Sequence, residues 1–206
     1  MIMKTADASG KTLEEAKAAA LAQLGENEQD VTFTILEEGK NAFLGLFGGK
    51  LYRVTATVND TPERRAKEFL GEITRMIGAP AEVSVSKGEN LSINLSGKHM
   101  GMLIGHRGET LDALQYLTSV VVNKGSNDPV RVMLDTENYR ARREETLIRL
   151  GAKMAAKARN THRRVVLEPM NPYERRILHA SLQANPYVDT HSEGEEPNRR
   201  VVIVPR

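Results

Sequence analysis

The stretch Ile104-Gly105-His106-Arg107-Gly108 decides how this chain is expected to fold. Its two glycines form a turn, and Leu111, Leu114 and Leu117 lie on one face of the helix predicted after it. The first turn of a helix has main-chain N–H groups without acceptors, and anions bind there. Because glycine has no Cβ, a phosphodiester can come close to this main chain. The same pattern occurs in plain helix–helix turns, so the surrounding sequence must decide between the two.

The surrounding sequence predicts a helix and two strands before the turn, and a helix and one strand after it. The first helix covers 62–78, with Thr61 as N-cap and Pro62 in its first turn. Two strands, 81–86 and 91–95, flank a hairpin sequence, and a third covers 130–134. The order αββααβ, with GxxG between the two later helices, resembles the type II KH domain.

The KH resemblance implies a loop that holds the backbone of about four nucleotides of single-stranded nucleic acid. The residues expected to form it here are Ile104, Gly105, His106, Arg107 and Gly108. This mechanism requires the bend to be open to solvent and not covered by acidic groups from elsewhere in the chain.

Composition excludes several classes of function. The 206 residues are 40% hydrophobic and 27% charged, which is ordinary for a folded protein. The absence of cysteine excludes disulfides, thiolate metal sites and a cysteine nucleophile. No hydrolase, Walker or metalloprotease motif is present, and the five histidines are scattered. We expect no catalysis, cofactor or metal, and a cytoplasmic location because no signal sequence or apolar span is visible.

Positive charge is concentrated near the C-terminal end. Residues 137–206 carry 14 Lys and Arg against 9 Asp and Glu, a net of +5. The longest helical pattern, 137–159, has a predicted apolar face of Leu147, Leu150, Met154 and Ala158. The basic band beside it is either a solvated face or a phosphate-binding stripe. Its members, with the residues that extend it, are Arg142, Arg149, Lys153, Lys157, Arg159, Arg163 and Arg164.

A second helix in this region begins clearly at Asn171, with Pro172 and Glu174 completing the start signal. Arg175 and His179 are four residues apart and therefore lie on one face. The opposite face is expected to be apolar; its residues are Tyr173, Ile177, Ala180 and Ala184. A strand at 165–167 precedes the helix, and strands at 187–192 and 199–204 follow it.

Two interpretations of Arg175 and His179 stay open on the sequence alone. In one, His179 is a structural histidine hydrogen-bonded beside the core, and the flanking Leu178 and Leu182 would cover the helix on a second side. In the other, Arg175 binds a phosphate while His179 donates a hydrogen bond or stacks on a base. Arg200 either joins that surface or pairs with the glutamates of the turn before it.

The first 58 residues predict a strand, a helix that starts at Thr12 and ends at Gly25, and strands at 31–36 and 51–58. The connection between the last two strands is unusually apolar for a loop. It either folds back under the sheet or docks a partner protein. The residues concerned are Lys40, Phe43, Leu46 and Phe47.

The C-terminal part, with Arg175 and His179, resembles the RxxxH domain, and the whole order resembles the Jag (SpoIIIJ-associated) family. The expected fold is α+β, with a βαββ module (1–58), a type II KH domain (61–136) and an RxxxH domain (137–206). The resemblance implies a non-catalytic bacterial protein that binds single-stranded RNA, or single-stranded DNA, through residues including Arg175 and His179. It also implies a post-transcriptional or cell-envelope regulatory role.

The protein partners considered are a small KH-only protein, the membrane insertase machinery and a second copy of the chain. The alternative hypothesis is a protein–protein adaptor that acts through the Phe43–Phe47 loop and the KH surface.

Overall fold

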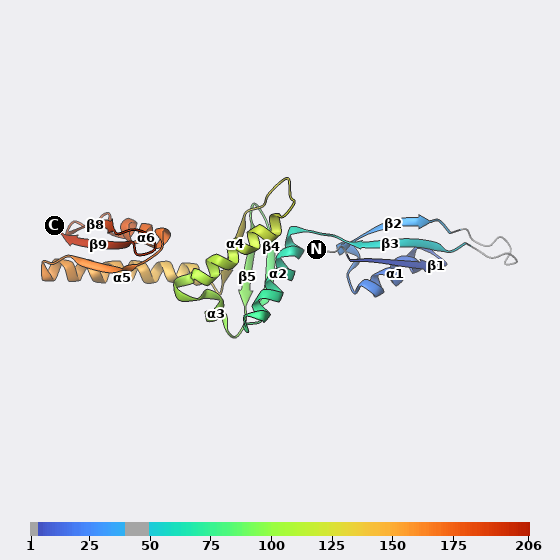
Figure 1. Cartoon of the computed structure of the whole chain (residues 1–206), viewed down its shortest axis with the longest axis horizontal. Coiled ribbons are helices and arrows are strands. Elements are labelled where there is room, and N and C mark those ends of the chain that lie inside the picture. Colours follow the sequence, from blue (N-terminus) through green and yellow to red (C-terminus); the bar gives the residue numbers. More distant parts are fainter. Residues whose placement is uncertain (1–3, 40–49) are drawn as a thin grey trace. The chain divides into compact units, whose positions relative to one another are not determined.

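The computed structural model describes residues 4–39 and 50–206. The chain divides into two compact units, with the division between Ala66 and Lys67. Three separate three-stranded sheets, one in the first unit and two in the second, are packed with helices (Figure 1). The predicted α+β class with three small modules is therefore confirmed. In these two ranges, no helix combines the length and the apolar character that crossing a bilayer demands.

The first unit contains a sheet of order β1-β3-β2, with both neighbouring pairs antiparallel. Its helix starts where Thr12 Oγ1 accepts the Glu15 N–H, at 3.1 Å, and ends at Gly25 in the left-handed conformation. The helix buries Ala16 and Ala20 with Val31, Val54, Ala56 and Val58 of the sheet. Its elements are β1 (Thr5–Gly10), α1 (Leu13–Leu24), the short helix η1 (Glu28–Asp30), β2 (Val31–Glu37) and β3 (Tyr52–Val58). The predicted docking residues Lys40, Phe43, Leu46 and Phe47 lie outside the described residues.

The KH region has the predicted order. Its sheet is β4-β5-β6, in which β4 and β5 are antiparallel and β5 and β6 are parallel. The elements are α2 (Pro62–Met76), β4 (Glu82–Lys87), β5 (Leu91–Ser96), α3 (Met100–Ile104), η3 (His106–Gly108), α4 (Glu109–Asn123) and β6 (Val132–Thr136).

The last KH strand begins two residues later than predicted, and one side chain explains the difference. Asn123, at the end of α4, accepts the Val130 N–H at 2.8 Å and donates to the Val130 carbonyl at 2.9 Å. Both main-chain groups of Val130 are thus occupied by the helix end. The paired strand starts only at Val132, opposite Leu91.

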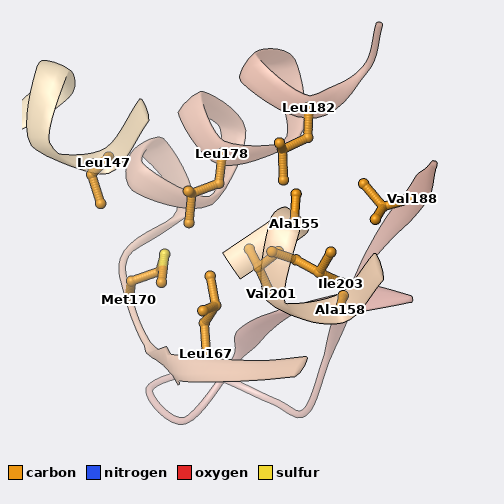
Figure 2. Close-up of a cluster of buried hydrophobic side chains, with 10 residues drawn as sticks. All are labelled: Leu147, Ala155, Ala158, Leu167, Met170, Leu178, Leu182, Val188, Val201 and Ile203. Carbon is orange, nitrogen blue, oxygen red and sulfur yellow. The ribbon is translucent and has the colours of Figure 1, made fainter. Parts of the chain in front are cut away.

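The C-terminal module packs a sheet of order β7-β9-β8 against two helices. Both strand pairs are antiparallel, and α5 contacts α6 and β9 (Figure 1). Figure 2 shows that the core side chains come from both helices and all three strands. The elements are α5 (Tyr139–Thr161), β7 (Val165–Pro169), α6 (Pro172–Leu182), β8 (Val188–Glu193) and β9 (Arg200–Pro205).

The buried face of α5 differs from the predicted one at Leu150. Leu147 is 1% exposed and Leu150 is 36% exposed, so the placement of Leu150 in the core was wrong. Ala158 is buried and Met154 packs against the core, as predicted, whereas Gly151 and Ala155 are buried without having been predicted. A Cβ at Gly151 would lie 3.1 Å from Leu178 Cδ2, so the missing side chain lets α6 approach closely.

Of the predicted apolar face of α6, only Ile177 packs against the core, and the second side given by Leu178 and Leu182 is the buried one. Tyr173 and Ala180 are exposed, and Ala184 lies beyond the helix and is exposed too. The buried residues are the opposite set: Glu174, Arg175, Leu178 and Leu182. Hydrophobic pattern alone misplaced the face because two charged residues lie on its buried side.

Leu147→Ala and Leu150→Ala make the same change on one helix and should differ strongly. Leu147→Ala leaves a cavity in the core and should lower the free energy of unfolding by about 2–5 kcal/mol. Leu150→Ala should lower it by less than about 1 kcal/mol. Urea unfolding followed by circular dichroism measures both. Equal losses would contradict this assignment of the core.

Candidate nucleic-acid interface

Three of the four residues of the GxxG loop have positive φ angles, which L side chains rarely adopt. The φ angles are 71° at Gly105, 54° at Arg107 and 87° at Gly108. A Cβ at Gly105 would overlap the Thr110 side chain, and one at Gly108 would lie 2.9 Å from Tyr139 Cε1. Both glycines are therefore required by contacts within the chain, apart from any role in the approach of a ligand.

One half of the loop is open. His106 is exposed, Ile104 and Gly105 are half-buried, and Gly108 caps the start of α4 without a side-chain cap. The local charge is mixed: Glu109 Oε1 is 3.8 Å from His106 Nδ1, while Asp112 pairs with Arg140 at 2.8 Å. An incoming phosphate would meet the helix end and His106, and also an exposed carboxylate.

The other half of the loop is covered by the C-terminal module. Arg107 Nη1 donates to the Pro169 carbonyl, and Nη2 donates to the Glu168 carboxylate. Gly108 is buried against Tyr139 at the start of α5. The requirement for an open bend that no acidic group from elsewhere in the chain covers is thus met only at Ile104, Gly105 and His106, and His106 has Glu109 of the adjoining helix beside it. The predicted role of Arg107 and Gly108 in phosphate binding stays a prediction.

Gly105→Ala should destabilise the KH region by more than about 1 kcal/mol, because the new methyl group overlaps Thr110 and alanine disfavours this conformation. The matched control is Gly101→Ala in α3, where an added Cβ has no neighbour within 4 Å. That change should be neutral or stabilising, by up to about 1 kcal/mol. Urea unfolding of both variants tests this. Two variants of equal stability would show that the loop tolerates a side chain.

Arg175 is buried, with 8% of its surface exposed, and both terminal nitrogens of its guanidinium are hydrogen-bonded within the module. Nη1 donates to the Met170 carbonyl at 2.8 Å, and Nη2 donates to Glu196 Oε1 at 2.6 Å. Glu196 belongs to the β8–β9 connection, so Arg175 joins α6 to the hairpin. This geometry gives Arg175 a structural role, and its contact with a phosphate stays a prediction.

His179 is hydrogen-bonded through both ring nitrogens. Nδ1 lies 2.8 Å from Thr190 Oγ1, and Nε2 lies 2.9 Å from Ser192 Oγ, both on β8. Burial lowers the pKa of His179 below its ordinary value, and the nearby positive charges of Arg175 and His191 lower it further. The arrangement is that of the structural interpretation, and direct contact with a nucleic acid stays a prediction.

The lowered pKa of His179 should make folding pH-dependent. Below about pH 6.5 the unfolded chain takes up a proton that the folded histidine resists, so stability present above that pH is lost as the pH falls toward the folded pKa. His179→Gln removes this titration while keeping an amide that can bond to Thr190 and Ser192. Urea unfolding between pH 8 and about pH 5 should show a steeper loss in the unaltered chain. If the free energies of unfolding of the two proteins change in parallel with pH, His179 contributes nothing to the pH dependence of stability.

The basic band of α5 is where the structure leaves the most positive charge available. Arg142, Arg149, Lys153 and Lys157 are all exposed. Within residues 4–39 and 50–206, no ion pair involves Arg142, Lys153, Lys157 or Arg163. The remaining predicted cations are partly engaged. Arg149 donates to Thr146, Arg164 pairs with Glu193 at 3.4 Å, Arg159 lies over the Tyr187 ring, and Arg200 donates to the Asn198 carbonyl.

Several residues around these sites were not predicted from the sequence. Tyr139 covers Gly108, Glu168 holds Arg107, and Glu196 holds Arg175. Glu174 is buried and pairs with Arg143 at 2.8 Å. Partners separated by 21 to 61 residues have no local spacing that could reveal them. The burial of charged side chains such as Glu174 and Arg175 would have indicated these partners, but burial is known only once the fold is known.

Comparison with known proteins decides the family. Three family models match in order: Jag N-terminus at 8–58, the KhpA/KhpB KH domain at 67–134, and the RxxxH domain at 145–205. A protein of Clostridium symbiosum named RNA-binding protein KhpB is 48% identical over 95% of this chain and 89% of its own length. The chain belongs to the KhpB (Jag) family. The family predicted from the sequence is therefore confirmed.

Other KhpB proteins extend this comparison. One from Bacillus subtilis is 36% identical, and the match covers 98% of both chains. One from Lactiplantibacillus plantarum is 37% identical over 72% of this chain and 46% of its own length. Both are named RNA-binding protein KhpB. The match to the RxxxH domain, at 145–205, spans Arg175 and His179.

Proposed function

We propose that this chain binds single-stranded RNA without catalysis, mainly through the exposed basic side chains of α5. The observation that carries the proposal is the stripe formed by Arg142, Arg149, Lys153 and Lys157, none of which has an ion pair in the described part of the chain. The KH and RxxxH matches, and relatives named RNA-binding proteins, support the same ligand class. Both domain types are binding modules, which favours a protein that is not an enzyme.

The spacing of the stripe suits a phosphate backbone. These four residues are seven, four and four positions apart, so they lie on one side of the helix. Consecutive cations of the last three are about 6 Å apart along the axis, at about 1.5 Å rise per residue. Arg163 and Arg164 continue positive charge beyond the helix end. Affinity from such a surface is electrostatic and depends on salt.

The other predicted residues have supporting roles in this proposal. His106, with the open main chain at Ile104 and Gly105, provides a second contact region in the KH loop. Arg175 and His179 hold α6 against the hairpin and so shape the surface of the RxxxH domain. Single-stranded rather than double-stranded RNA, a regulatory role and a cytoplasmic location belong to the proposal as implications of the family.

A second candidate function is a protein–protein contact, and one surface favours it. Tyr116, Leu117 and Val120 are exposed large apolar side chains on neighbouring turns of α4. Such a strip fits another folded domain better than it fits an RNA backbone. The occupants considered are a KH-only protein and a second copy of this chain.

The double variant Lys153→Gln with Lys157→Gln tests the RNA proposal. Loss of two phosphate contacts on a single strand should reduce the slope of log affinity against log salt by about 1.4. The matched control is Lys4→Gln with Lys11→Gln, which makes the same charge change at exposed lysines of the first unit. Fluorescence anisotropy with a labelled single-stranded RNA of random sequence, titrated at several salt concentrations, gives the slopes. If the slopes of log affinity against log salt are the same for the two double variants, Lys153 and Lys157 of α5 do not contact the RNA.

A further inference from the structure

Two arginines from different modules hold one short segment, Glu168-Pro169-Met170, at the end of β7. Arg107 of the KH loop donates to the Glu168 carboxylate and to the Pro169 carbonyl. Arg175 of α6 donates to the next carbonyl, that of Met170, at 2.8 Å. The segment is therefore fixed on one side by the GxxG loop and on the other by the arginine of the RxxxH pattern.

The groups that accept hydrogen bonds from Arg107 are oxygen atoms, placed as two oxygens of a phosphate would be. A guanidinium presents two parallel N–H donors, and this fork fits a carboxylate and a phosphate in the same way. In this structure the fork is occupied by one carboxylate oxygen and one carbonyl oxygen. Arg107 is the only arginine or lysine of the tetrapeptide Gly105-His106-Arg107-Gly108. The one permanent positive charge of this tetrapeptide is thus bound by Glu168 and Pro169 of the same chain.

In this position Arg107 cannot bind Glu168 and an RNA phosphate at the same time, and the residues around it explain why. A cleft of about 460 Å³ beside the loop is lined by His106 and Arg107 and by four glutamates, Glu109, Glu168, Glu174 and Glu196. Glu174 and Glu196 are paired with Arg143 and Arg175, so a phosphate entering the cleft would be repelled mainly by Glu109 and Glu168. Contact with RNA therefore requires Arg107 to leave Glu168 and turn outward.

We propose that Glu168 is an internal competitor for the RNA backbone at the KH loop, so that Arg107 exchanges between this carboxylate and a phosphate. The inference rests on the proposed RNA-binding function. The Glu168 side chain is 78% exposed and that of Arg107 is 22% exposed, so this is a surface ion pair that an anion can reach. Exposed pairs are weak, and the competition should reduce affinity by about two- to fivefold.

The competition also couples the two modules. Release of Arg107 removes the KH loop's hold on the segment that Arg175 anchors from the other side. RNA on the loop and the contact between the loop and β7 are therefore mutually exclusive, and each weakens the other by the same factor.

Glu168→Gln tests the proposal in the full chain, with the labelled single-stranded RNA of random sequence as probe. Affinity should rise about two- to fivefold, because the amide no longer competes for Arg107. The matched control is Glu195→Gln, the same charge change at an exposed residue of the β8–β9 connection in the same module. In an Arg107→Gln background, Glu168→Gln should have no further effect. A gain no larger than that of Glu195→Gln, or one that persists without Arg107, overturns the proposal.

Hydrogen exchange of the free protein gives a readout that does not need RNA. Glu168→Gln should speed amide exchange at residues 105–108, whereas Glu195→Gln should not. If the unaltered chain binds RNA and responds to the α5 lysine changes, but Glu168→Gln alters neither exchange nor affinity, only the competition fails. If no variant binds RNA, the proposed function fails and the competition fails with it.

Discussion

Burying the guanidinium of Arg175 is the constraint on which the C-terminal module depends. A buried charge is costly unless it is paired and hydrogen-bonded. The fold meets this requirement by bringing the Met170 carbonyl and Glu196 to its two terminal nitrogens. The neighbouring residue Glu174 is buried as well and is held by Arg143 of α5. These adjacent charges fix α6 to the hairpin, to the end of β7 and to the long helix.

This constraint changes how the RxxxH pattern is understood. Arg175 and His179 lie on one face of α6, as their spacing indicates, but that face is turned into the module rather than outward. His179 bonds to two hydroxyl groups of β8, and Arg175 bonds to the ends of β7 and of the hairpin. The pattern organises the surface, while the charge most accessible to a polyanion lies on α5. In the proposed function, α5 binds the RNA and α6 holds the module together.

The sequence predicted the features that depend on local chemistry. The start of α6 at Asn171 is confirmed by its Oδ1, which accepts the Glu174 N–H at 2.9 Å. The start of α1 and the order of the KH elements follow equally local signals. Periodicity failed where small residues form the packing surface. It selected Leu150 because leucine is more apolar than Gly151, although the glycine is the residue that α6 approaches. The contact between Arg107 and Glu168 spans 61 residues, so only the fold reveals it.

The parallel pairing of β5 with β6 has a consequence for the order of events during synthesis. A parallel pair needs a crossover connection, and here the crossover consists of α3, the GxxG loop and α4. The ribosome therefore releases the loop before the strand that completes its sheet. Tyr139, which packs on Gly108, is translated three residues after that strand ends at Thr136. A nascent chain stalled before Thr136 would carry the whole GxxG sequence without the framework that gives it shape.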